Sequence, residues 1–162
     1  MNVNFNFAGT NFGKHLSPRL ASQVRTFVGP NVATGYGKRA WSDADRQKLV
    51  DNANALDRLS GDDFDVDGTF GTYDYPACIT VTPKDPSKHK SCSIHQDGIG
   101  EYDTPDAKSV VVAKDGDYSK FGKFQCPNII DPNAMLETAI NEIPTLRKNR
   151  GRNFQSQLDL KA

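Results

Sequence analysis

Two histidines flank a cysteine in this sequence, and residues of these types bind metal ions or attack electrophiles. His89, Cys92 and His95 are spaced three residues apart, and Cys78 and Cys126 lie in neighbouring predicted strands. Zinc takes about four nitrogen or sulfur ligands in a tetrahedron, so the set has suitable chemistry without a recognised spacing. Side chains alternate along a strand, so positions 89, 92 and 95 do not share one face. We therefore favour solvated histidines and a buried cysteine over a zinc site or a cysteine nucleophile.

An acidic run with regular spacing is a second candidate for metal chemistry. Asp63, Asp65 and Asp67 alternate along the chain, Gly68 follows, and Asp74 is the twelfth residue counted from Asp63. Oxygen ligands at positions 1, 3, 5 and 12 of a loop, with glycine at position 6, resemble the calcium loop of an EF-hand. Calcium is therefore a candidate cofactor.

The match to a calcium loop is partial. Asp74 is shorter than the bidentate glutamate expected at the last position, and Tyr75 and Pro76 block the helix that would follow. Phe64 and Val66 alternate with the aspartates, which is the pattern of a strand with one solvated acidic face. We favour that strand, and so predict no cofactor, with calcium as the alternative.

Sequence motifs of the common enzyme classes are missing. GxSxG, HExxH, the P-loop and GxGxxG do not occur as complete motifs. We therefore predict no catalytic residue and a protein that is not an enzyme. A metal-dependent enzyme that uses the aspartates or the histidines is the third alternative for its function.

Positive charge is concentrated at the two ends of the chain, although the formal net charge is zero. Residues 1–40 contain five Lys and Arg residues and no acidic residue, and residues 144–162 contain five against Asp159 alone. Cations near a helix C-terminus gain from the helix dipole, which explains the first charges of the second run better than the later ones. Contact with phosphates needs cations and no sequence motif. The predicted nucleic-acid contacts are Arg147, Lys148, Arg150, Arg152, Lys38 and Arg39.

Three segments have the spacing and the capping residues of helices. Ser17 and Pro18 begin the first, in which apolar residues recur every four positions. A second helix is predicted near residues 42–60, because Ser42 and Asp45 resemble a capping box. A third is predicted near residues 131–148, with Pro144 expected to break or kink it.

Between the second and third helices the pattern changes to short strands separated by turn residues. Apolar residues alternate or cluster near positions 64–66, 78–82, 92–94 and 110–112, and Asp115-Gly116 suits a hairpin turn. Residues 3–7 also alternate, which predicts an N-terminal strand. The predicted fold is α+β, with an antiparallel meander of about five to six strands, the N-terminal strand, a central helix and a C-terminal helix.

The length and composition fit one domain over residues 1–162, with a basic tail from about residue 149. Three cysteines without CxxC spacing are a poor disulfide framework, and no apolar run approaches the roughly 18 residues of a membrane span. The first residues lack the features of a secretory signal. We expect a virion or cytoplasmic protein without a membrane partner.

The charge layout favours a structural role. Patches of opposite sign on one chain favour head-to-tail contacts between copies. We therefore predict a viral or phage coat-type subunit that forms homo-oligomers and contacts RNA or DNA through its basic ends. The alternative is a small regulatory or inhibitory module that binds a protein or nucleic-acid partner.

Overall fold

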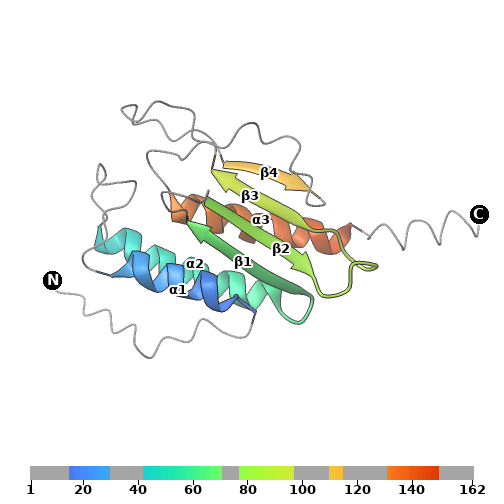
Figure 1. Ribbon diagram of the computed structural model, residues 1–162, viewed down its shortest axis with the longest axis horizontal. Coiled ribbons are helices and arrows are strands. Elements are labelled where there is room, and N and C mark those ends of the chain that lie inside the picture. The colour runs from blue at the N-terminus through green and yellow to red at the C-terminus, as the bar shows by residue number, and fades with distance from the viewer. Residues whose placement is uncertain (1–14, 30–41, 71–76, 97–109, 115–130, 150–162) are drawn as a thin grey trace, which may run out of the picture.

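The structure is a computed structural model, and it describes residues 15–29, 42–70, 77–96, 110–114 and 131–149. Within these ranges the chain forms three helices and one four-stranded antiparallel sheet, which confirms the α+β class (Figure 1). The elements in chain order are α1 (Pro18–Val28), α2 (Asp43–Ser60), β1 (Phe64–Phe70), β2 (Ala77–Pro83), β3 (Cys92–Gln96), β4 (Val110–Lys114) and α3 (Pro132–Lys148).

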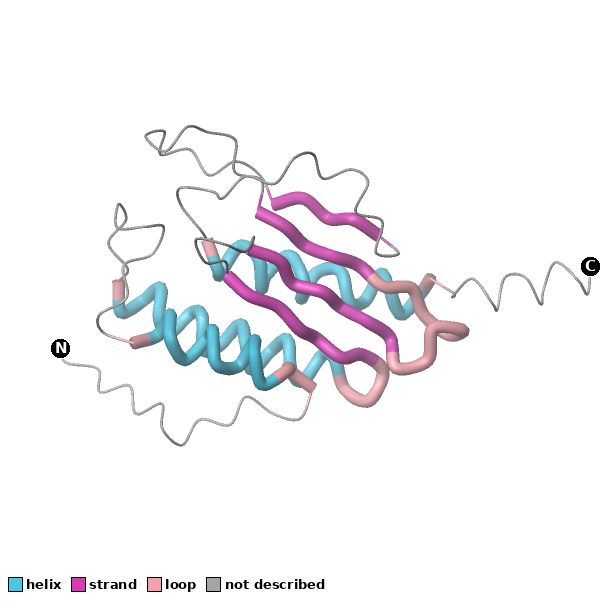
Figure 2. The backbone as a smooth tube through the Cα atoms, viewed as in Figure 1, coloured by secondary structure: helices cyan, strands magenta, loops and turns pink. Residues whose placement is uncertain are grey.

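The strands follow one another across the sheet in the order β1-β2-β3-β4, so the predicted meander is confirmed. The described sheet has four strands, fewer than the five to six expected. The predicted strand at residues 3–7 and the predicted turn at Asp115-Gly116 lie outside the described residues. All three helices lie on one side of the sheet, α1 and α2 towards β1 and α3 behind the later strands (Figure 2).

Local capping fixes where the helices begin. The Ser17 hydroxyl accepts a hydrogen bond from the Leu20 backbone at the start of α1. Ser42 and Asp45 form the expected capping box at the start of α2. The helices predicted at these positions are therefore confirmed.

Helix α3 begins where its sequence predicts, with Asp131 as N-cap and Pro132 in the first turn. It continues through Pro144 to Lys148, so Pro144 does not end the helix. A proline ring removes one backbone hydrogen bond. The packing of Ile143 and Leu146, both buried in the core, offsets that loss.

The alternation in β1 sorts its side chains between two environments. Phe64, Val66 and Phe70 are buried against the helices, and the ring of Phe70 meets that of Phe27 from α1 edge-on at 5.2 Å between centroids. Asp65 and Asp67 lie on the opposite face. We call this the outer face of the sheet, because no described helix covers it. The acidic-faced strand expected from the sequence is therefore present.

A polar connection joins α2 and α3. The buried Asn133 side chain donates to the Asp45 carbonyl at 3.0 Å and accepts from Asn52 at 3.1 Å. At the surface, Lys48 forms an ion pair with Glu137 at 2.8 Å. These contacts fix the position of α3 along α2.

None of the helices within the described ranges is long and apolar enough to cross a bilayer.

Candidate functional site

Arg147, the first of the predicted nucleic-acid contacts, is held within the fold. Its guanidinium donates to the carbonyls of Leu59 and Ser60 at the end of α2, and to the Asp63 carboxylate at 3.1 Å. It also lies over the Phe64 ring, 5.7 Å from the centroid. The last carbonyls of a helix have no partner inside the helix, so Arg147 supplies the donors that α2 lacks. Its side chain is 34% exposed.

Lys148 is the first cation after this contact, and it is exposed in the last turn of α3. Asn149 leaves the helix in an extended conformation. Arg150, Arg152, Lys38 and Arg39, the other predicted contacts, lie outside the described residues. The C-terminal cations therefore fall into two groups. Arg147 connects α3 to α2, and the cations from Lys148 onward follow this contact.

The aspartates of the alternative reading, the calcium loop, are held by different cations. Asp63 pairs with Arg147, Asp65 lies 3.9 Å from the Lys84 ammonium, and Asp67 pairs with Arg19 at 2.7 Å. Asp65 and Asp67 belong to strand β1, and Asp63 directly precedes it. The three carboxylates are therefore spread along the chain instead of surrounding one metal position. Asp74 lies outside the described residues. Within the described ranges, no group of three or more His, Cys, Asp or Glu residues is placed to hold a metal ion.

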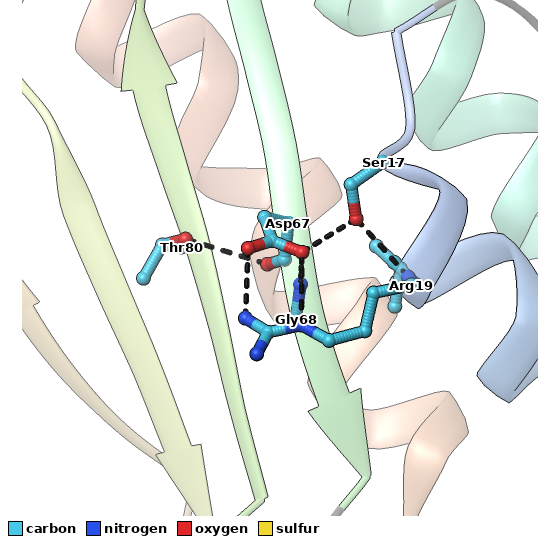
Figure 3. A network of polar contacts seen from close by, with 6 residues as sticks. Ser17, Arg19, Asp67, Gly68 and Thr80 are labelled. Carbon is cyan, nitrogen blue, oxygen red and sulfur yellow. Dashed lines mark hydrogen bonds and ion pairs between the residues drawn. The ribbon is translucent and has the colours of Figure 1, made fainter.

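Asp67 is the centre of a polar network on the outer face at the β1 edge (Figure 3). Its carboxylate accepts hydrogen bonds from the Ser17 hydroxyl at 2.5 Å, from the Gly68 backbone at 2.8 Å, and from Nε and Nη2 of Arg19. The Asp67 carbonyl accepts from Thr80 on β2. The network thus joins the start of α1 to the first two strands.

The Asp67 network has an expected pH dependence. Burial disfavours the charged carboxylate, but the hydrogen bonds from Ser17, Arg19 and Gly68 outweigh burial and lower the Asp67 pKa. A carboxyl whose folded pKa lies below its unfolded value stabilises the fold above the unfolded pKa, near 4, and loses that effect as pH falls through the folded pKa.

We therefore expect Asp67→Asn to lower the melting temperature at about pH 7 and to lower it much less at about pH 3. Because the pair is half exposed, the free-energy difference at neutral pH should be about 1 kcal/mol or less. Thermal melts followed by circular dichroism across this range would measure it. An equal gap between the two proteins at both pH values would contradict the prediction.

Cys78 and His95 meet on the outer face, although the sequence pattern pointed to Cys92. The Cys78 sulfur lies 3.4 Å from His95 Nε2, because the two residues are paired across β2 and β3. Burial raises the pKa of Cys78 to about 11 and lowers that of His95. At neutral pH the pair is a thiol and a neutral imidazole, which is not the charge state of an activated nucleophile.

The other members of the candidate metal cluster are separated from this pair. Cys92 is buried on the face that packs against the helices, opposite to His95 on the same strand. The His89 ring lies against Phe64, with 5.2 Å between ring centroids. Cys126 lies outside the described residues. Cys92 and His95 therefore lie on opposite faces of β3, as alternation along a strand predicts, whereas His89 precedes the strand and does not test the prediction.

Sequence reasoning missed both the network at Asp67 and the pair at Cys78. Arg19 and Asp67 are 48 residues apart, and Cys78 and His95 are 17 apart. Alternation along a strand predicts which face of the sheet a side chain lies on. It does not predict which residue of the next strand lies beside it, because that depends on the register between the strands.

Comparisons with protein-family models, with curated protein sequences and with solved structures returned no match for this chain. The candidate sites therefore rest on the geometry and the charges described above.

Proposed function

We propose that this chain is a non-enzymatic structural subunit of the viral or phage coat type, which self-associates and contacts nucleic acid through its basic termini. The observation that carries the proposal is how the basic residues divide at the end of α3. Arg147 is held by α2 and Asp63, whereas Lys148 is exposed. Arg150, Arg152 and Lys161 follow it in the sequence, against Asp159 alone. This basic segment, residues 148–162, is the proposed phosphate contact.

The same division supports a role for the helix that precedes the segment. Helix α3 is anchored along its length by buried Met135, Leu136, Ala139 and Ile143. Its C-terminal end therefore presents Lys148 from a fixed position, while the dipole of the helix is compensated by cations there. A basic segment attached to a rigid element contacts phosphates without needing a sequence code.

The proposal is tested by removing the charges of the basic segment while keeping Arg147. We expect the triple variant Lys148→Gln, Arg150→Gln, Arg152→Gln to purify with much less nucleic acid than the wild type, measured by the absorbance ratio at 260 and 280 nm. The salt dependence of binding should weaken, with the logarithmic slope reduced by about two to three, because each phosphate contact releases condensed counterions.

A matched control removes three cations from the β2–β3 turn, as Lys84→Gln, Lys88→Gln and Lys90→Gln. It changes the net charge equally but leaves residues 148–162 unchanged, so the proposal expects its nucleic-acid content to stay near the wild-type value. Equal losses in both triple variants would show a response to net charge alone and would contradict the proposed contact.

Self-association is read from the same preparations by size-exclusion chromatography and negative-stain microscopy. The coat-type proposal expects large particles of uniform size. A protein that stays monomeric or dimeric and binds one partner at 1:1 stoichiometry would instead support the regulatory module.

A further inference from the structure

The chain segment that leads into α1 lies along the β1 edge of the sheet. Residues 15–17 form a short parallel bridge with β1, in which the Val66 N–H donates to the His15 carbonyl at 3.1 Å. The Val66 carbonyl accepts from the Ser17 N–H at 2.8 Å. Both backbone groups that Val66 turns away from β2 therefore have partners.

The next two N–H groups on this side of β1 are bonded to side chains. Backbone groups alternate between the two sides of a strand, so Gly68 and Phe70 point away from β2 as Val66 does. The Gly68 N–H donates to the Asp67 carboxylate at 2.8 Å, and the Phe70 N–H donates to the side-chain carbonyl of Gln23 in α1 at 3.3 Å. Three successive outward donors of β1 are thus bonded within the chain.

This arrangement matters because a sheet edge with unpaired backbone groups is a template for strands of other molecules. Strand β1 is seven residues long and carries Phe64, Val66 and Phe70 on its buried face, which is a length and a composition that favour strand pairing. Charge at an edge opposes such pairing. Arg19 and Asp67 place an ion pair at this edge, beside the start of α1 (Figure 3).

We infer that residues 15–17, Gln23 and Asp67 form an edge cap, which keeps β1 from pairing with a strand of a second copy. The start of α1 supplies the partners of Val66 and Phe70, and it also holds the Asp67 carboxylate through Ser17. The cap therefore depends on the packing of α1 against β1. The inference goes beyond the proposed function, because it states which surface self-association avoids.

The first test removes the two side-chain acceptors of the edge cap. The double variant Gln23→Ala, Asp67→Ala leaves the N–H groups of Gly68 and Phe70 without these acceptors. Asp67→Asn is the matched control, because it loses the same charge but keeps an amide oxygen at position 67 and keeps Gln23. In sedimentation velocity we expect the double variant to associate beyond the wild-type state at protein concentrations on the order of tenfold lower than Asp67→Asn does. Equal association of the two variants would contradict the inference.

A second control separates an exposed edge from a general loss of stability. Ser17→Ala removes the N-cap of α1 and so destabilises the fold, but it keeps the acceptors at Gln23 and Asp67. The double variant and Ser17→Ala are compared at urea concentrations that give them equal free energies of unfolding. We expect extra association of the double variant alone. If Ser17→Ala associates as strongly, instability causes the association and the edge cap is not its barrier.

Hydrogen–deuterium exchange read by NMR locates the association. In the dissociated double variant the Gly68 and Phe70 amides should exchange on the order of tenfold faster than in Asp67→Asn, because their acceptors are gone. In the associated form both amides should become slow again, since a strand of the second copy supplies new acceptors. Rapid exchange of these amides in the associated form would place the contact on another surface and overturn the inference.

These outcomes are independent of the coat-type function, because they compare variants that share residues 148–162. Wild-type protein without particles or nucleic acid would overturn the coat-type function and leave the expected difference between the variants unchanged. Particles and nucleic acid in the wild type, with no difference between the double variant and Asp67→Asn, would leave the coat-type function standing and overturn the edge cap.

Discussion

Replacing Gly68 by alanine is expected to lower the free energy of unfolding by about 1–3 kcal/mol, and replacement by valine is expected to lower it further. Gly68 lies on the helix-facing side of β1, opposite Ile79 of β2. A Cβ atom there would lie 2.5 Å from the Cys78 carbonyl oxygen and 3.0 Å from the Ile79 Cα atom. Both are backbone atoms, so no side-chain rotation relieves the contact.

The close approach of β1 to β2 at Gly68 also positions the backbone N–H that donates to Asp67. A shift between β1 and β2 would move the Gly68 N–H that donates to Asp67. Urea unfolding followed by circular dichroism would measure the loss. The control is Asp65→Ala on the solvated face of the same strand, which should change stability by about 0.5 kcal/mol or less. A Gly68→Ala protein as stable as this control would contradict the close packing of β1 on β2.

Truncating Arg147 is expected to have the second large effect on stability. Arg147→Ala removes the donors to the Leu59 and Ser60 carbonyls, the pair with Asp63 and the contact with the Phe64 ring. Hydrogen bonds from a charged group contribute about 1.5–3 kcal/mol each, reduced here by partial exposure. We expect a total loss of about 2–3 kcal/mol in the free energy of unfolding.

Two substitutions separate the geometry of Arg147 from its charge. Arg147→Lys keeps the charge but lacks the planar fork that reaches two carbonyls and a carboxylate, so it should recover only part of the stability. Lys148→Ala, one residue later, should leave stability within about 0.5 kcal/mol of the wild type. Equal free energies of unfolding for Arg147→Ala and Lys148→Ala in urea would show that the contact of Arg147 with α2 does not stabilise the fold.

Arg147 also decides how nucleic-acid binding is tested. A deletion that begins at residue 147 removes the donors at the end of α2 together with the proposed phosphate contacts, so a loss of nucleic acid could reflect unfolding. Substitution at Lys148, Arg150 and Arg152 leaves Arg147 in place. The stability and the binding contributions of the C-terminal cations are then measured in different variants.

The helices and the strand character of β1 were predictable because their signals are local. Ser42 and Asp45 are three residues apart, and their reciprocal hydrogen bonds form within the first turn of α2. Phe64 and Val66 alternate with aspartates, so a strand with one buried face explains the spacing better than a calcium loop does. The expected effect of Pro144 was partly wrong, since burial of the residues around it keeps α3 helical to Lys148.

The sequence by itself determined the type and approximate bounds of the described elements, and the concentration of cations at the two ends. Only the tertiary structure decided which partner each charge has. Arg147 meets Asp63 across 84 residues, Arg19 meets Asp67 across 48, and Cys78 meets His95 through strand register. The physical reason is that caps and periodicity act within one or two turns, whereas the pairing of distant side chains is fixed only when helices pack on a sheet of defined register.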